Sequence, residues 1–178
     1  RIPIGVNVLR NDALSALSIA AATDADLIRV NVHVGAVVTD QGLVTGKAAE
    51  TMRLRTQLAP NVKVFADLRV KHSAPIADFS LEEELADLVE RGHADAVLVT
   101  GPRTGAAPDP STLERVRAVI GSVPLVVASG ASEKNAPELA SLVDGIIVGS
   151  SLKKGGKVRS AVDPARVARF MKSVGRTK

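Results

Sequence analysis

Six short runs rich in Val and Ile recur along the chain, and their spacing constrains the fold more than any other feature. Consecutive runs are separated by the length of one crossover helix, and several are apolar on both faces, as buried strands of a parallel sheet are. The expected strands are Ile2–Val8, Leu27–Val32, Val62–Leu68, Asp95–Val99, Pro124–Ala128 and Gly145–Val148. The alternation predicts a parallel α/β fold with right-handed crossovers.

Helix start signals lie in the gaps between these runs. Ser80-Leu81-Glu82-Glu83 is a capping box, in which hydroxyl and carboxylate satisfy the first free amides of a helix. Asp109-Pro110 and Asp163-Pro164 each place an acceptor before a proline at the first helical position. We also expect Ser132 to cap a helix that runs through Leu142.

Two architectures accommodate such a series, an open doubly wound sheet and a closed barrel. The dinucleotide-binding fingerprint G-x-G-x-x-G is missing after every expected strand. Polar residues instead follow nearly all six strands, as the active-site loops of a barrel require. A (β/α)8 barrel takes about 250 residues, whereas this chain has 178 and opens directly in a strand. We therefore expect an α/β fold, a (β/α)8 TIM barrel of which residues 1–178 supply about six βα units as a single domain, with the first two strands missing. A native six-unit open sheet is the alternative.

Composition excludes several classes of function. The chain has no Cys, which removes disulfides, zinc–thiolate sites and thiol nucleophiles. It has three Phe and neither Tyr nor Trp, so bases have little to stack on and no nucleic-acid partner is expected. No stretch of 18 apolar residues is long enough for a transmembrane helix, and residues 1–6 do not resemble a signal peptide. A cytoplasmic location is expected.

The net charge of +4 hides an asymmetry between the two parts of the chain. Residues 153–178 hold nine Lys or Arg against one acid, Asp163, whereas the preceding residues hold 14 against 18. Such a basic C-terminal segment attracts phosphate or an anionic membrane surface. A solvated helix face and tail explain the same pattern, so we expect at most peripheral membrane association.

Candidate catalytic residues follow from the side-chain alternation of the second and third strands. Arg29 and Asn31 share one face of their strand because side chains alternate. If the third strand continues as far as Lys71, Asp67 and Lys71 share a face as well. Asp67 is then suited to general-base chemistry, and Lys71 to electrostatic stabilisation or to a Schiff base. An internal Arg–Asp or Asp–Lys ion pair that only fills the barrel is the structural alternative.

Further polar residues follow the strand ends and are expected to bind substrate. Asn7 ends the first strand, and Thr100 with Gly101 follows the fourth. Asp40 lies in the long, glycine-punctuated loop 35–42 after the second strand, and His72 follows the third. No cofactor and no dedicated transition-metal site are expected, although Asp40 or Asp67 is compatible with a weak Mg²⁺ site.

The last two expected strands end in small turns, Ser129-Gly130 and Gly149-Ser150. In an eight-stranded barrel these are the positions that hold phosphate, and glycine lets the backbone approach it closely. Serine hydroxyls and the charges of Lys153 and Lys154 suit the same ligand. Small turns also end strands for steric reasons alone.

Taken in order along the chain, these motifs resemble the BtpA family. The residues that carry the resemblance are Gly5-Val6-Asn7-Val8-Leu9-Arg10-Asn11-Asp12, Ile28-Arg29-Val30-Asn31-Val32, Thr39-Asp40-Gln41-Gly42, Ala66-Asp67, Val70-Lys71-His72, residues 94–101 and Asp144-Gly145-Ile146-Ile147-Val148-Gly149-Ser150. The resemblance implies a barrel similar to the ribulose-phosphate-binding superfamily, with two further βα units upstream. Ala128 departs from the glycine expected before Ser129.

The family resemblance leaves two functions open. Cyanobacterial members are associated with photosystem I accumulation, which implies a non-catalytic biogenesis or assembly factor for a membrane complex. Other members occur in organisms without photosynthesis, which favours an ancestral enzyme. We expect an enzyme acting on a phosphorylated sugar or nucleoside-type metabolite, as a lyase, an isomerase or a glycosidic-bond hydrolase. Incomplete closure of the barrel also predicts association into a homo-oligomer, because strand edges would be exposed.

Overall fold

The computed structural model describes residues 1–70, 73–101 and 106–175. Six strands form one parallel sheet in the order β1-β2-β5-β7-β8-β9. The strands are β1 (Gly5–Val6), β2 (Leu27–Val30), β5 (Lys63–Asp67), β7 (Ala96–Val99), β8 (Leu125–Val127) and β9 (Gly145–Ile146). Each lies within one of the six expected runs, so the predicted parallel α/β fold is confirmed.

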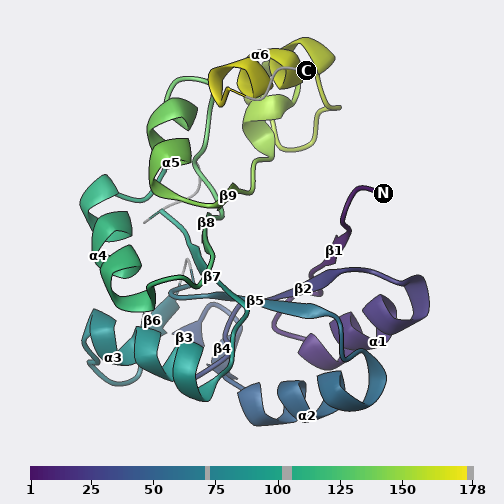
Figure 1. Cartoon of the computed structure of the whole chain (residues 1–178), viewed down its shortest axis with the longest axis vertical. Coiled ribbons are helices and arrows are strands. Elements are labelled where there is room, and N and C mark those ends of the chain that lie inside the picture. Colours follow the sequence, from purple (N-terminus) through teal and green to yellow (C-terminus); the bar gives the residue numbers. More distant parts are fainter. Residues whose placement is uncertain (71–72, 102–105, 176–178) are drawn as a thin grey trace.

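The strand order distinguishes a barrel-type sheet from a doubly wound one. A doubly wound sheet reverses its order at a switch point, whereas here each strand lies beside its predecessor in the sheet. Right-handed crossovers then place every helix on the same face, and the sheet curls away from them. Figure 1 shows this curl, with the helices along its outer face. They are α1 (Ala13–Thr23), α2 (Ala48–Leu58), α3 (Leu81–Ala86), α4 (Pro110–Ile120), α5 (Ala136–Leu142) and α6 (Pro164–Ser173).

The helix starts show how local sequence sets the elements. The capping box is formed, with the Ser80 hydroxyl accepting from the Glu83 amide and the Glu83 carboxylate accepting from the Ser80 amide. Asp109 and Asp163 cap α4 and α6 as expected. A π-helical turn, η1 (Asp87–Arg91), continues α3.

The expected cap of α5 is wrong. Ser132 donates its amide and its hydroxyl to the side-chain oxygen of Asn135, at 2.8 and 3.0 Å. This closes a turn, and the helix begins only at Ala136. An Asn that accepts locally competes with the helix in this way.

Most of the core lies between the sheet and its helices. One cluster, including Leu88, Val97, Leu113 and Leu125, packs the later strands against α3, η1, α4 and α5. Another, including Leu17 and Ile28, packs β2 against α1. The concave face carries only a small apolar cluster of Leu98, Val126 and Ala128, with Phe65 beside it.

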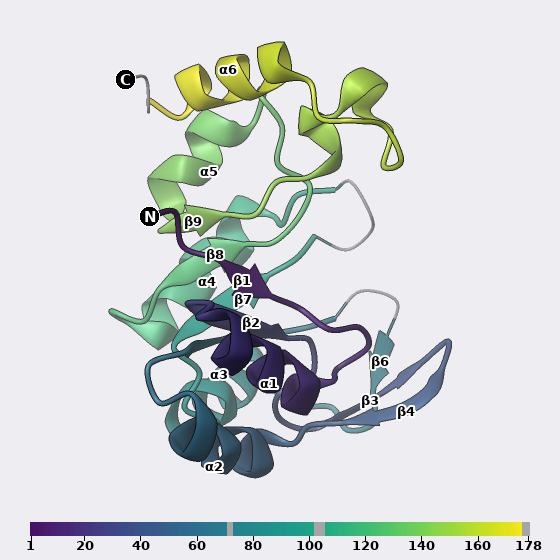
Figure 2. The ribbon, with the colours of Figure 1, turned by 90° about the vertical axis from the view of Figure 1, so that its right-hand side faces the viewer.

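A second, three-stranded antiparallel sheet extends from the carboxyl edge of the main sheet. It has the order β4-β3-β6 and consists of β3 (Ala36–Thr39), β4 (Gly42–Thr45) and β6 (Ser73–Pro75). Figure 2 shows it projecting on the right, the side toward which the strands of the main sheet end. Loop 35–42 of the sequence prediction is therefore the first strand and turn of a hairpin.

Two short 3₁₀ turns follow the last strand, η2 (Ser150–Leu152) and η3 (Lys154–Gly156). They connect β9 to α6, whose Phe170 joins the core. None of the helices in the described ranges is both long and apolar enough to span a bilayer.

Candidate functional site

The carboxyl ends of six parallel strands meet at one edge of the sheet (Figure 2). Most of the expected site residues lie at this edge. Asn7 follows β1, Asn31 follows β2 and Asp67 ends β5. At the same edge the turns after β7, β8 and β9 carry Thr100, Gly101, Ser129, Gly130, Gly149 and Ser150.

The centre of this edge is a hydrogen-bonded group of Arg29, Asn31 and Asp67. Arg29 donates to Asp67 through Nε at 3.1 Å and through Nη2 at 2.9 and 3.0 Å. Asn31 Nδ2 donates to Asp67 Oδ2 at 2.7 Å. Arg29 and Asn31 therefore share one face of their strand, as expected, and both side chains reach one carboxylate of the paired strand.

Burial gives this group its electrostatic character. The Asp67 side chain is 1% exposed and that of Arg29 is 22% exposed. Both oxygens of Asp67 accept hydrogen bonds, which fix the plane of the carboxylate. Asn7 Nδ2 supports the group by donating to Arg29 O at 2.9 Å and more weakly to Asn31 Oδ1 at 3.4 Å. The arrangement therefore holds a carboxylate and a guanidinium in fixed orientation.

Gly101 and Gly130 are required by a close backbone approach. A Cβ on Gly101 would lie 2.0 Å from Ala106 O, and one on Gly130 would lie 2.1 to 2.2 Å from backbone atoms of Ala106 and Ala107. Gly130 also has a φ of +78°, which disfavours other residues. Close packing therefore explains why glycine is needed at both positions. Thr100, beside Gly101, donates its hydroxyl to Arg69 O at 3.2 Å.

Gly149 differs from these two glycines. A Cβ there would meet nothing within 4 Å. The space beside this exposed turn is therefore open, which leaves room for a ligand to approach the backbone. Ser151 ties the turn to the neighbouring one, since its hydroxyl donates to Ala131 O at 2.7 Å.

Asp40 is separate from the Asp67 group. It lies at the tip of the β3–β4 hairpin, where its side chain is 65% exposed and pairs with Arg10 at 2.6 Å. This pair links the hairpin to the segment after β1. Lys71 and His72 lie outside the described residues.

His33 follows β2 and is buried against Gly92, the residue after η1. Its Nε2 lies 2.8 Å from Gly92 O, and its Nδ1 is buried without a partner in the described part of the chain. Burial lowers the pKa of the imidazole, outweighing the hydrogen bond to Gly92. The ring is therefore a neutral core residue.

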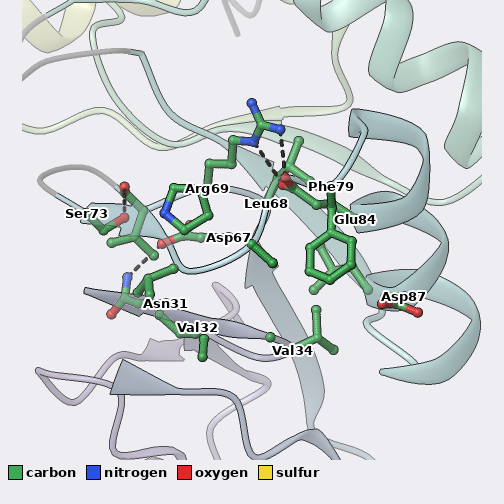
Figure 3. Close-up of a pocket in the computed structure, with 17 residues that line it drawn as sticks. Asn31, Val32, Val34, Asp67, Leu68, Arg69, Ser73, Phe79, Glu84 and Asp87 are labelled. Atoms are coloured by element: carbon green, nitrogen blue, oxygen red, sulfur yellow. Dashed lines mark hydrogen bonds and ion pairs between the residues drawn. The ribbon is translucent and has the colours of Figure 1, made fainter. Parts of the chain in front are cut away.

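Sequence reasoning missed a cavity of about 140 Å³ beside the Asp67 group. We call it the Phe79 pocket. It lies between the ends of β2 and β5, the small sheet, and the helices α3 and η1 (Figure 3). The residues that line it are Asn31, Val32, Val34, Gly35, Ala36, Val37, Asp67, Leu68, Arg69, Val70, Ser73, Pro75, Ala77, Phe79, Glu84, Asp87 and Leu88. No sequence motif marks it, because its walls come from separate segments.

One wall of the Phe79 pocket carries an ion pair. Arg69 donates to both oxygens of Glu84, at 2.8 and 2.7 Å, and this partner raises the pKa of the guanidinium. Within the described ranges no group of three or more His, Asp or Glu is placed to hold a metal ion. A weak Mg²⁺ site at Asp40 or Asp67 stays a prediction.

Comparison with solved structures supports the barrel assignment. N-(5'-phosphoribosyl)anthranilate isomerase from Pyrococcus furiosus has a TM-score of 0.62 and 19% identity, over 99% of this chain and 75% of that one. For 3-hexulose-6-phosphate synthase from Salmonella typhimurium the TM-score is 0.64 and the identity 16%, over 98% and 74%. At these identities the likeness shows the fold, an α/β fold of the TIM-barrel type.

Sequence comparison identifies much nearer relatives. The Photosystem I biogenesis protein BtpA of Synechocystis sp. is 42% identical over 172 residues, which are 97% of this chain and 60% of that protein. Uncharacterised proteins of Methanocaldococcus jannaschii and Thermococcus kodakarensis are 43% and 46% identical, and the chain spans 67% and 64% of their lengths. The model of the BtpA family matches residues 1–176. With the ordered motifs and the barrel-type fold, this match shows that the chain belongs to the BtpA family.

Proposed function

We propose that the protein is an enzyme that binds a phosphorylated sugar or nucleoside-type metabolite at the carboxyl edge of its sheet. The observation that carries the proposal is the Arg29–Asp67–Asn31 group around the buried Asp67, at the same edge as a turn whose Gly149 has open space beside it. Charged groups this well ordered are costly to bury for packing alone. The names of the proteins of similar fold specify phosphorylated compounds as well.

Each residue has a role in this proposal. Ser129, Gly130, Gly149 and Ser150 surround the phosphate, with amides and hydroxyls as donors. Arg29 keeps its Nη1 for the ligand, since that atom makes no hydrogen bond to the described residues. Asp67 accepts a proton from the substrate, Asn31 orients it, and Lys71 stabilises developing negative charge. Asn7, Asp40, His72, Thr100 and Gly101 contribute substrate contacts. Whether the bond change is a lyase, isomerase or hydrolase step stays open.

A panel of ligands tests the proposal. Thermal unfolding is followed with inorganic phosphate, ribose 5-phosphate, ribose, cytidine and cytidine 5'-phosphate. A ligand at a hundred times its Kd stabilises the folded state by about 2.7 kcal/mol, so phosphate esters raise the Tm while ribose does not. Equal shifts for ribose and ribose 5-phosphate, or none for any compound, contradict the phosphate site.

Turnover of a compound found in this way tests the catalytic part of the proposal. Asp67→Asn removes the proton acceptor and is expected to abolish turnover, while the ligand still raises the Tm of the folded fraction. Undiminished turnover in Asp67→Asn removes the carboxylate from the mechanism.

A non-catalytic biogenesis or assembly factor is the second candidate. The name of the Synechocystis relative favours it, as do the exposed Lys154, Lys157 and Arg159 between η2 and α6. These side chains suit electrostatic contact with an anionic surface. Co-sedimentation with vesicles containing anionic lipid, lost at high salt, supports this candidate. Co-sedimentation that salt does not weaken contradicts an electrostatic contact.

A further inference from the structure

The Phe79 pocket has a size and a lining that the phosphate site does not explain. Most of its wall is apolar, contributed by Val34, Val37, Leu68, Val70, Pro75, Ala77, Phe79 and Leu88. Its volume of about 140 Å³ is close to that of an engineered cavity of about 150 Å³ that binds benzene. The pocket therefore matches a single six-membered ring, and a fused pair of rings would extend beyond this volume.

The charges on the wall select against phosphate. Among the described residues that line the pocket, three are acidic, Asp67, Glu84 and Asp87, and one is basic, Arg69. The Arg69 guanidinium already pairs with Glu84 in bidentate geometry. These carboxylates would repel an anionic group. A carboxylate has four lone-pair sites, and in the described part of the chain Glu84 accepts two hydrogen bonds from Arg69 and Asp87 one from Arg91, so these two can accept further N–H donors. In Figure 3, Asn31 and Asp67 lie on one side of the pocket, with Phe79 and Asp87 on the other.

The pocket shares its polar end with the candidate site. Asn31 and Asp67 belong both to the hydrogen-bonded group and to the pocket wall. The strand order places β7 between β5 and β8. At about 4.8 Å per strand, the turn after β8 lies roughly 10 Å along the sheet from Asp67 at the end of β5. A ring in the pocket and a phosphate at the β8 and β9 turns are thus separated by about the length of a sugar phosphate.

We propose that the Phe79 pocket binds a planar six-membered ring carrying N–H donors, such as an aminopyrimidine, joined to the sugar phosphate of the substrate. This inference rests on the proposed function and names the group that its substrate carries. The ring packs against Phe79 and the aliphatic wall, donates to the carboxylates, and brings the bond to the sugar near Asp67.

A filled pocket and a matched control test the inference. Ala77 lines the pocket from an exposed loop, so Ala77→Phe fills the space without touching the core. Ala74 is exposed in β6 and points to the opposite face, because Ser73 and Pro75 are the β6 residues that line the pocket. Ala74→Phe is therefore the control. The Kd values of ribose 5-phosphate, cytidine, cytidine 5'-phosphate and adenosine 5'-phosphate are measured by calorimetry.

The expected result separates the ring from the phosphate. Cytidine 5'-phosphate binds at least tenfold more tightly than ribose 5-phosphate and adenosine 5'-phosphate. Ala77→Phe removes this gain and Ala74→Phe keeps it. Equal affinity for cytidine 5'-phosphate and ribose 5-phosphate overturns the inference and leaves the phosphate proposal standing. Binding of cytidine that Ala77→Phe abolishes, without any contribution from phosphate, supports the pocket and contradicts the phosphate site. Absence of binding by all four compounds overturns both.

Discussion

At the scale of single residues, Asp67 determines how Arg29 and Asn31 are arranged. The carboxylate is almost fully buried and accepts from both side chains. The alternation of strands made this convergence predictable, since matching parity on adjacent strands points side chains to one face. The Arg69–Glu84 pair was not predictable, because it joins the segment after β5 to a helix through the tertiary fold.

The Arg29–Asp67 pair gives a prediction about stability. Asp67→Asn leaves a partly buried guanidinium without its counter-charge and is expected to lower the free energy of unfolding by about 3 to 5 kcal/mol. Arg29→Met combined with Asp67→Asn removes both charges and should cost less than Asp67→Asn alone. Urea denaturation of the variants gives the coupling energy. Additive losses would mean that the pair is not coupled in the folded state.

His33 gives a prediction about pH. Its folded pKa lies below the unfolded value of about 6.5, so the unfolded state binds the proton first. Its contribution to stability is complete above about pH 6.5 and is lost as the pH falls toward the folded pKa. NMR titration of the imidazole should give a midpoint below 6.5. A midpoint at or above 6.5 would contradict the buried, neutral ring.

At the scale of elements, a recurrent aspartate joins neighbouring strands at their amino ends. Asp26, Asp95 and Asp144 each precede a strand and accept the backbone amide at or near the start of the preceding strand in the sheet, from Ile4, Val64 and Leu125 at 2.7 to 2.8 Å. Each also pairs with an arginine. For Asp144, the Arg117 hydrogen bond and then the Leu125 amide lower the pKa of the carboxyl group. These contacts set the register of the sheet at the edge opposite the candidate site.

Asp95 allows this role to be measured. It accepts from Val64 N at 2.8 Å and pairs with Arg55 at 2.7 Å, with its side chain 22% exposed. Asp95→Ala leaves these partners unsatisfied and should cost about 1 to 3 kcal/mol in the free energy of unfolding. Asp87→Ala is the control, since its exposed pair with Arg91 at 3.4 Å is worth well under 1 kcal/mol. Similar losses for both variants in urea denaturation would contradict the account.

Capping and turn residues in the sequence predicted that the helices and strands exist better than they predicted where each one begins and ends. Capping residues located α3, α4 and α6, because a cap satisfies amides within one turn of the chain. The start of α5 was misplaced because Asn135 competes for Ser132. The segment of β3 was expected to be a loop. Its pairing with β6 could not be predicted from local sequence, because β6 lies more than 30 residues further along the chain.

At the scale of the whole molecule, strand order explains why the candidate site lies where it does. Because the six parallel strands follow one another in sequential order, their carboxyl ends all lie at one edge of the sheet. The helices that connect them lie on its outer face. The repeat of strand and helix made this architecture predictable. The Phe79 pocket was not, since it depends on how the small sheet packs against α3. Association with a second copy of the chain stays a prediction.

The affinity for ribose 5-phosphate with Gly, Asn or Asp at position 149 tests the central claim most directly. The open space at Gly149 leaves room for the side chain in both Gly149→Asn and Gly149→Asp, whereas Gly130 offers no such room. The two variants have the same shape and differ by one negative charge, which repels a bound phosphate. We predict that Gly149→Asp weakens the Kd at least tenfold relative to Gly149→Asn, about 1.4 kcal/mol or more. Equal Kd values for the two variants would contradict a phosphate site at this edge.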